Sequence, residues 1–325
     1  MLRLSLACWD YDRTRALADG RVQPEGIDLV YLNQPVEETF FRMMRFAEFD
    51  ASEMSLSSYV ASLGRAEPPF IAIPAFPSRY FRHSCIFVSA KSGIRQPSDL
   101  KGRRVGVPEY QMTAPVWIRG ILSDDHGVKV TDYQHLSGGE EEPGRDEKQK
   151  LDLPSSIQLS PIGKEQTLSG MLATGELDAL VTARAPSTFP KAVNRLFPDY
   201  VEREKAYYKR TKIFPIMHTV VIRRDVYSKN PWVAQALYKA FVASKKIAMD
   251  MYAQTAAMTS MLPWTSAAAE EARAEMGEDW WPYGLAPNRH VLETFLRYHH
   301  EQGLSKKLFK PEELFAKETL ESFKV

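Results

Sequence analysis

A buried strand that ends in a polar turn and leads into a helix is the pattern that most constrains the fold of this chain. Residues 98–107 read as a turn and then a buried strand, and a polar turn and a helix to about residue 124 follow. A helix over residues 166–175 leads to a strand over 177–181, which ends in the polar turn 182–186. Such units build open α/β sheets, in which ligands bind at the carboxyl ends of strands.

The length and element order predict two lobes. A chain of 325 residues exceeds the size at which one hydrophobic core usually stops growing. The chain crosses to a second lobe near residue 103, returns in a strand over 213–222, and continues in one long helix over 225–250. We therefore expect an α/β fold of two doubly wound lobes, with a small anionic ligand in the cleft between them. The predicted lobe I comprises residues 1–103 and 217–325, and the predicted lobe II, inserted in it, comprises residues 104–216.

Composition excludes several classes of partner. The 42 Lys and Arg residues nearly balance the 41 Asp and Glu residues, so the basic surface of a nucleic-acid or membrane binder is absent. The two cysteines, Cys8 and Cys85, lie in apolar runs that resemble strands, and they are too few for zinc spacing. We interpret them as buried thiols of a reduced compartment and expect no metal site.

The first residues predict the location. They alternate between apolar and polar and run directly into charged residues, which indicates a first strand rather than a signal peptide. No segment approaches the roughly 20 apolar residues of a membrane span. We therefore expect a cytoplasmic protein.

Three segments carry a resemblance to a known fold. They are Asp-Leu-Lys-Gly-Arg-Arg-Val-Gly-Val at 99–107, Gly-Glu-Leu-Asp-Ala-Leu at 175–180, and Val-Ile-Arg-Arg-Asp-Val at 221–226. In this order and spacing they resemble the type II periplasmic-binding-protein fold, in which the first and third are common at the crossing and the return.

A narrower resemblance covers nearly the whole chain. The chain resembles the 4,5-dihydroxyphthalate decarboxylases in the segments 10–15, 53–58, 76–79, 106–111, 143–145, 214–218 and 281–284, and in Asn288-Arg289. The resemblance implies a carboxy-lyase that converts 4,5-dihydroxyphthalate, a small aromatic dicarboxylate, to protocatechuate and CO₂. It also implies a protein without a signal peptide. Assembly into a homo-oligomer stays open.

The chemistry of this reaction sets the requirements for a site. Direct loss of CO₂ leaves an aryl carbanion, which is too costly, so the ring carbon is protonated first. A hydroxyl para to the leaving carboxylate supplies electrons, and the dienone that forms loses CO₂ and regains aromaticity. The site needs an acid, a base and groups that hold two carboxylates, with pKa values of the acid and base near the working pH. No electron-sink cofactor is required.

The candidate partners for the carboxylates are arginines on predicted ligand-side loops: Arg13, Arg79, Arg82 and Arg184. Arginine suits this role because its planar fork binds a carboxylate through two hydrogen bonds. Surface solubility or an internal ion pair is the competing explanation for each of them.

Three residues are candidates for proton transfer. His218 lies on the return strand and His83 on a ligand-side loop, and histidine titrates near neutral pH. Glu109 precedes the helix of the second lobe, where it either accepts a hydroxyl proton or stabilises the helix N-terminus. For His218 a place in the core is the alternative.

The remaining candidates bind the substrate. Ser57, Ser58 and Thr113 stand at predicted helix starts, where they hold an oxyanion or act as helix caps. Tyr11 follows the first strand and offers a ring for stacking on an aromatic substrate.

Two other functions stay open at this point. The first is a non-catalytic solute-binding protein for an aromatic or dicarboxylic acid, and the second is another cytoplasmic enzyme on this fold, such as a chorismate dehydratase. Release of CO₂ and a substrate screen separate the three. The charged Gly/Pro loop 137–150 reads as a solvated connection rather than an active-site flap.

Overall fold

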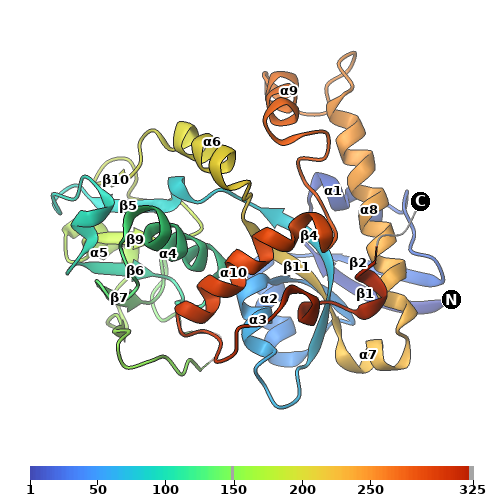
Figure 1. The fold of residues 1–325 in the computed structure, drawn as a ribbon, viewed down its shortest axis with the longest axis horizontal. Helices are drawn as coiled ribbons and strands as arrows, with labels where there is room; N and C mark the ends of the chain where they lie inside the picture. The colour runs from blue at the N-terminus through green and yellow to red at the C-terminus, as the bar shows by residue number, and fades with distance from the viewer. Residues whose placement is uncertain (148–149, 322–325) are drawn as a thin grey trace. The chain divides into compact units, whose positions relative to one another are not determined.

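The computed structural model describes residues 1–147 and 150–321, which divide into two compact units. Unit 1 consists of residues 1–79, 218–292 and 309–325, of which the last four are outside the described part. Unit 2 consists of residues 80–217 and 293–308. Each unit contains one sheet, so the chain is the mixed α/β protein that the sequence predicts (Figure 1).

The sheet of unit 1 has the strand order β2-β1-β3-β11-β4. Strand β1 is parallel to β2 and to β3, and the returning strand β11 is antiparallel to β3. The strands are β1 (Leu2–Cys8), β2 (Ile27–Asn33), β3 (Ala51–Ser55), β4 (Phe70–Arg79) and β11 (Ile216–Arg223).

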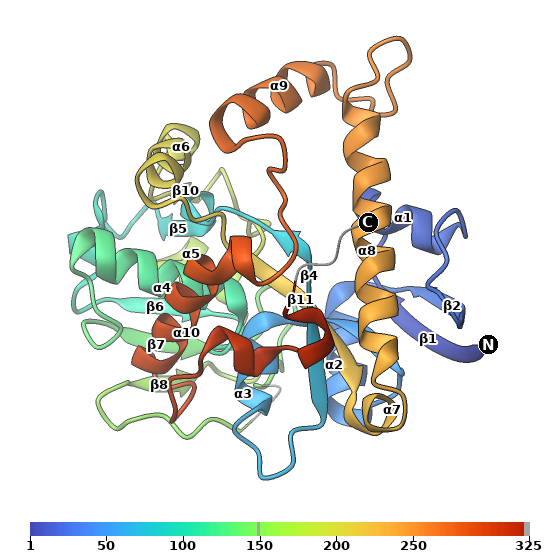
Figure 2. The same cartoon turned by 45° about the vertical axis from the view of Figure 1, so that its right-hand side comes forward.

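The helices of unit 1 connect these strands and then follow β11. Helix α8 is the longest, α1 packs against it, and α9 follows beyond its end (Figure 2). The helices are α1 (Asp12–Ala18), α2 (Val36–Phe46), α3 (Leu56–Ser62), α7 (Arg224–Lys229), α8 (Trp232–Tyr252) and α9 (Thr265–Met276).

The sheet of unit 2 has the strand order β10-β5-β9-β6-β7-β8. Its strands are β5 (Ile86–Ser89), β6 (Arg104–Val107), β7 (Gln134–Ser137), β8 (Leu159–Pro161), β9 (Ala179–Val181) and β10 (Val193–Arg195). The helices are α4 (Thr113–His126), α5 (Leu168–Thr174), α6 (Tyr200–Thr211) and the C-terminal part of α10 (Arg289–Glu301).

The first division between the units differs from the predicted position. It falls between Arg79 and Tyr80, whereas the sequence pattern placed the crossing near residue 103. The physical reason is the pairing of β5, which hydrogen-bonds to β9 and β10 and so belongs to the second sheet. The second division lies at Met217–His218, and residues 293–308 of the predicted lobe I group with unit 2.

The predicted helix over residues 225–250 is two helices in the structure. Helix α7 ends at Lys229, and α8 begins at Trp232. Pro231 explains the break, because proline lacks the N–H of a continuous helix and disfavours helical geometry at the preceding residue. Asn230 accordingly has an extended φ of −140°.

The sequence predicts two buried thiols and no membrane-spanning segment. Cys8 and Cys85 are both buried free thiols. Among the helices of the described residues, none has both the length and the apolar character needed to cross a membrane. The cytoplasmic location stays a prediction.

Candidate functional site

A carboxylate stands in the middle of the most buried strand of unit 1. All five residues of β3 are buried, and the Glu53 side chain has no exposed surface. Its Oε1 accepts hydrogen bonds from the Tyr11 hydroxyl (2.6 Å) and from Nδ1 of His218 (2.5 Å). Its Oε2 accepts from the backbone N–H of Trp9 (3.2 Å) and the thiol of Cys8 (3.6 Å). These four donors offset the cost of burying the carboxylate.

The register of two strands brings His218 to this carboxylate. His218 pairs with Ser55, and Val220 pairs with Glu53, so His218 and Glu53 lie diagonally on the same face of the sheet. The ring of Phe40 packs edge-on against the imidazole, with ring centres 4.8 Å apart, and restrains its orientation.

The hydrogen bonds decide which groups are charged. Burial raises the pKa of Glu53, but the His218 charge and the hydrogen bonds from His218, Tyr11 and Trp9 outweigh it, so this pKa is lowered. Burial, followed by the nearby Glu53 charge, raises the pKa of the Tyr11 hydroxyl and of the Cys8 thiol. At neutral pH the site therefore holds one carboxylate, a neutral phenol and a neutral thiol.

The arrangement can hold or give a proton at one atom. Because Glu53 accepts from Nδ1, the ring presents Nε2 as the atom that exchanges protons, as in other carboxylate–histidine pairs. The His218 side chain is 16% exposed, and its Nε2 makes no hydrogen bond to the parts of the chain that the structure describes.

Arg13 lies beside this pair, between two aromatic rings. Its guanidinium carbon is 4.2 Å from the ring centre of Tyr11 and 4.2 Å from that of Trp281. Its Nε donates to the carbonyl of Pro77 (2.6 Å), and its Nη1 donates to Asp12 (2.8 Å). Within residues 1–147 and 150–321, Nη2 has no hydrogen-bond acceptor. The stacked guanidinium therefore offers a rigid donor to an anion.

Arg79 has a different environment. It is buried, and its Nη2 donates to the carbonyl of Pro282 (2.7 Å) and to Oδ1 of Asn288. These bonds connect the end of β4 to the segment that carries Trp281. The structure thus gives Arg79 a positioning contact, and its role as a carboxylate partner stays a prediction.

The predicted serine cap of α3 is wrong by two residues. The N-cap is Ser55, whose Oγ accepts from the backbone N–H of Ser58. Ser57 and Ser58 are buried in the first turn of the helix. Their role in binding stays a prediction.

The other predicted residues lie in unit 2. Arg82 is buried and donates to Sδ of Met217 (3.1 Å), to Sγ of Cys85 (3.6 Å) and to the carbonyl of Ala183 (3.3 Å). Arg184 follows β9 and is exposed. Thr113 is buried at the first position of α4.

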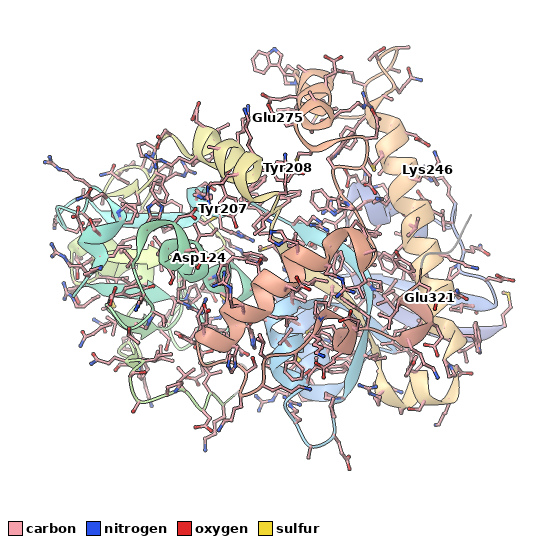
Figure 3. All side chains as sticks on the ribbon, in the orientation of Figure 1. Asp124, Tyr207, Tyr208, Lys246, Glu275 and Glu321 are labelled. Carbon is pink, nitrogen blue, oxygen red and sulfur yellow. The ribbon has the colours of Figure 1, made fainter. Side chains whose placement is uncertain are left out.

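His83 lies in an aromatic environment. Its ring packs against Phe197 (5.9 Å) and against Tyr207 (5.2 Å), which Figure 3 labels on α6. Burial, with the positive charges of His126, Arg203 and Arg210, lowers the pKa of His83 to about 4. His83 is therefore neutral at neutral pH, and Glu204 lies 4.0 Å from its Nδ1.

We expect the substitution His83→Phe to reduce the acid sensitivity of the fold. A histidine pKa lowered to about 4 from 6.5 stabilises the folded state above pH 6.5, and this contribution is lost as the pH falls through about 4. As the pH falls from 6.5 to about 4, the wild type should therefore lose more free energy of unfolding than the variant does. Urea titrations at several pH values measure it, and a difference that stays constant from pH 7 to pH 4 would contradict the interpretation.

Glu109 is an ion-paired carboxylate. It is buried, and Nε (2.9 Å) and Nη2 (2.5 Å) of Arg145 donate to its Oε1. Glu147 lies nearby and accepts from the backbone N–H of Tyr110. Burial, with a contribution from the Glu109 charge, raises the pKa of Glu147 to about 7. A proton-transfer role for Glu109 stays a prediction.

The loop over residues 137–150 is attached to unit 2 along part of its length. The hydroxyl of Thr182 donates to Glu140 (2.5 Å), and the backbone N–H (2.7 Å) and hydroxyl (2.6 Å) of Ser187 donate to Glu141. Lys148 and Gln149 of the predicted loop lie outside the described residues.

One central residue was missed from the sequence. Glu53 belongs to a segment that carries the family resemblance, but it was not considered as a proton-transfer group. The signal was a carboxylate within an otherwise uncharged strand, Ala-Ser-Glu-Met-Ser. Across the described residues, no group of three or more His, Cys, Asp or Glu side chains is placed to hold a metal ion.

Solved structures share the fold at low identity. The periplasmic aliphatic sulphonate binding protein SsuA from Escherichia coli is 12% identical, with a TM-score of 0.53, over 98% of this chain and 99% of that chain. The alkanesulfonate-binding protein SsuA from Xanthomonas axonopodis pv. citri, also 12% identical with a TM-score of 0.53, covers 97% and 98%. The fold is therefore that of the periplasmic binding proteins, as the sequence predicts.

Curated relatives identify the family. No protein-family model matches the chain. A 4,5-dihydroxyphthalate decarboxylase from Comamonas testosteroni is 45% identical over 327 residues, which cover 100% of this chain and 99% of that protein. A second, from Pseudomonas putida, is 50% identical over 188 residues, which cover 58% of this chain and 73% of that protein. The chain therefore belongs to the 4,5-dihydroxyphthalate decarboxylase family, a family of carboxy-lyases.

Proposed function

We propose that this protein decarboxylates an aromatic dicarboxylate, 4,5-dihydroxyphthalate, to protocatechuate and CO₂, and that His218 is the proton donor. The observation that carries the proposal is the His218–Glu53 hydrogen bond, which occupies Nδ1 and leaves Nε2 of the ring without a hydrogen bond to the described residues. The full-length relative from Comamonas testosteroni supports the choice of substrate.

The proposed reaction begins with a proton on carbon. The hydroxyl para to the leaving carboxylate, most readily after loss of its own proton, pushes electrons into the ring. The ring carbon that bears the carboxylate takes a proton from Nε2 of His218 and becomes tetrahedral. The bond from that carbon to the carboxylate then breaks, its electron pair restores the aromatic ring, and the phenolate oxygen takes up a proton again.

The neighbours of His218 assist this step. The buried Glu53 carboxylate stabilises the imidazolium that gives the proton and keeps Nε2 toward the substrate. The hydroxyl of Tyr11 donates to Oε1 of Glu53, the same oxygen that accepts from Nδ1 of His218, and so helps to hold the carboxylate in place. Arg13, held between Tyr11 and Trp281, binds the carboxylate that remains on the product.

Substitution of Arg13 by glutamine is expected to raise KM about 10- to 100-fold, because a charge-assisted hydrogen bond contributes about 1.5–3 kcal/mol. Lysine should restore part of the affinity, since it keeps the charge but not the planar fork. Arg15→Gln is the matched control, because Arg15 lies on the same helix, is half exposed and pairs with Asp10. Steady-state kinetics measure the effect, and equal KM values for the Arg13 and Arg15 variants would remove Arg13 from the site.

The reaction itself has a direct test. Purified protein is incubated with 4,5-dihydroxyphthalate in D₂O, and the product is followed by chromatography and proton NMR. We expect protocatechuate with one deuterium at the carbon that lost the carboxylate. Absence of both product and CO₂ would refute the proposed function, and product without deuterium at that carbon would refute protonation from an exchangeable group.

Binding without turnover is the second candidate function. The likeness of the fold to the sulphonate-binding proteins favours it. It predicts that 4,5-dihydroxyphthalate binds, as seen by calorimetry, while no CO₂ is released. The same incubation therefore decides between the two functions.

A further inference from the structure

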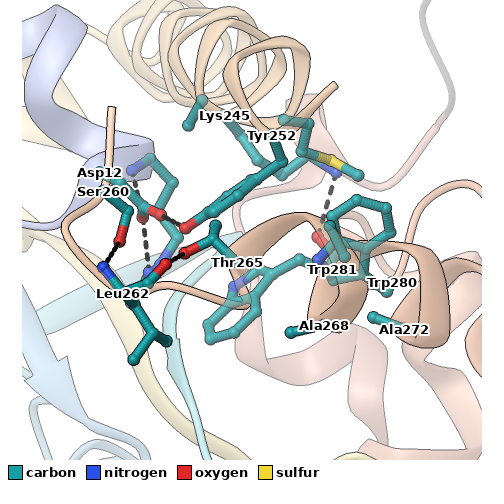
Figure 4. Close-up of a pocket in the computed structure, with 14 residues that line it drawn as sticks. Asp12, Lys245, Tyr252, Ser260, Leu262, Thr265, Ala268, Ala272, Trp280 and Trp281 are labelled. Atoms are coloured by element: carbon teal, nitrogen blue, oxygen red, sulfur yellow. Dashed lines mark hydrogen bonds and ion pairs between the residues drawn. The ribbon is translucent and has the colours of Figure 1, made fainter. Parts of the chain in front are cut away.

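A pocket of about 290 Å³ lies in unit 1 next to Arg13 and Trp281 (Figure 4). This volume is near the lower end of the roughly 300–1,000 Å³ of small-molecule sites, so the pocket suits a molecule with a single ring. It is lined by Asp12, Arg13, Lys245, Ala248, Met249, Tyr252, Ser260, Leu262, Thr265, Ala268, Ala269, Ala272, Trp280 and Trp281.

Small side chains on two helices create the space. Ala268, Ala269 and Ala272 of α9 and Ala248 of α8 line the pocket where larger side chains would fill it. Other parts of the wall are flat and largely apolar, with the indole rings of Trp280 and Trp281 and the phenol ring of Tyr252. Tyr252 and Trp280 are 6.4 Å apart between ring centres. Such walls favour the faces of an aromatic ring.

The charges around the pocket are paired, with one exception. Nζ of Lys245 donates to both oxygens of Asp279 (2.6 and 2.7 Å) and to the carbonyl of Trp281 (3.0 Å). Asp12 accepts from Arg13 and from the hydroxyl of Tyr252. Nη2 of Arg13 donates no hydrogen bond within the described part of the chain and is therefore available to a ligand. The pocket therefore combines apolar walls with one unused cationic donor.

We propose that this pocket binds an aromatic monocarboxylate, with the ring against Trp280, Trp281 and Tyr252 and the carboxylate on Arg13. Leu262 at the pocket is 61% exposed, so this part of the pocket wall is in contact with solvent. One guanidinium cannot serve two carboxylates fully, so a ligand here competes with the substrate for Arg13. This regulatory consequence rests on the proposed function, whereas the binding itself does not.

The binding test uses benzoate as the probe and the full chain. Isothermal calorimetry should show one site for benzoate and several-fold weaker binding of cyclohexanecarboxylate, which lacks the π-faces. Ala272→Leu fills the pocket and should weaken benzoate at least about tenfold, which corresponds to 1.4 kcal/mol. Ala274→Leu is the matched control, because Ala274 lies on the same helix, is exposed and does not line the pocket. It should bind benzoate as the wild type does.

The kinetic test follows inhibition. Benzoate should be competitive with 4,5-dihydroxyphthalate in the wild type, and Ala272→Leu should keep kcat and KM while losing this inhibition. Equal affinity of Ala272→Leu and Ala274→Leu for benzoate would overturn the proposal. Inhibition of Ala272→Leu by benzoate as strong as that of the wild type would also overturn it. If benzoate binds as expected but no CO₂ is ever released, the proposed function fails and the pocket stands. If CO₂ is released and benzoate does not bind, the pocket fails and the function stands.

Discussion

Replacement of His218 by glutamine is expected to lower kcat about 100- to 10,000-fold, the range in which a positioned acid or base contributes. Glutamine keeps a donor that can reach Glu53, but it has no group that titrates near neutral pH. The proposed proton transfer to carbon is then lost, while binding through Arg13 persists, so KM should change far less than kcat. Single-turnover measurements with 4,5-dihydroxyphthalate separate the two quantities.

The control for this variant is His300→Gln. His300 lies on the exposed side of α10, where its Nδ1 contacts the carbonyl of Ser305 (2.8 Å). We expect its kinetics to match those of the wild type. If His218→Gln is folded by circular dichroism and keeps a kcat within a few-fold of the wild type, His218 is not the proton donor.

Replacement of Glu53 by glutamine is expected to produce the second largest loss, about 100-fold or more in kcat. This carboxylate accepts from Nδ1 of His218, and a carboxylate in that position orients the ring and stabilises its protonated form. Without the charge the imidazolium loses its partner, so the step that gives the proton slows. Measurement of kcat under saturating 4,5-dihydroxyphthalate tests the loss.

The same variant should also change stability with pH. Because the pKa of Glu53 is lowered in the folded protein, the carboxylate stabilises the fold above its unfolded value of about 4.5, and this contribution is lost as the pH falls through the folded value. The destabilisation of Glu53→Gln should therefore be present at pH 7 and should diminish in acid.

The control is Glu275→Gln on α9, a residue that is exposed and labelled in Figure 3. It should be neutral in activity and stability. A kcat of Glu53→Gln close to that of the wild type would show that the pair is only structural.

The elements of the fold could be predicted from local patterns. Alternation and turn residues indicated β1, β3 and β11, and the segments after the strands indicated Tyr11 and Arg13. The boundary between the units could not be predicted, because it depends on the partner of β5. Strand partners that are distant in sequence leave no local signal.

The same argument applies to the site. His218 was selected by its type and its strand, but Glu53 is its neighbour only through a pairing between residues 165 positions apart. Arg79 resembled Arg13 in the sequence, since both follow strands and precede polar segments. The difference arises because the carbonyl of Pro282 and the side chain of Asn288 accept hydrogen bonds from the guanidinium of Arg79. They accept none from Arg13.

The insertion of unit 2 between β4 and β11 has a consequence for synthesis on the ribosome. When residues 1–79 have emerged, β3 has β1 on one side, but β11 arrives only after more than 130 further residues. During that interval the other edge of β3 is unpaired and Glu53 lacks its imidazole partner. An unpaired strand edge is a template for association with other chains. Expression of this protein should therefore benefit from slower translation or from chaperones that shield that edge until β11 is made.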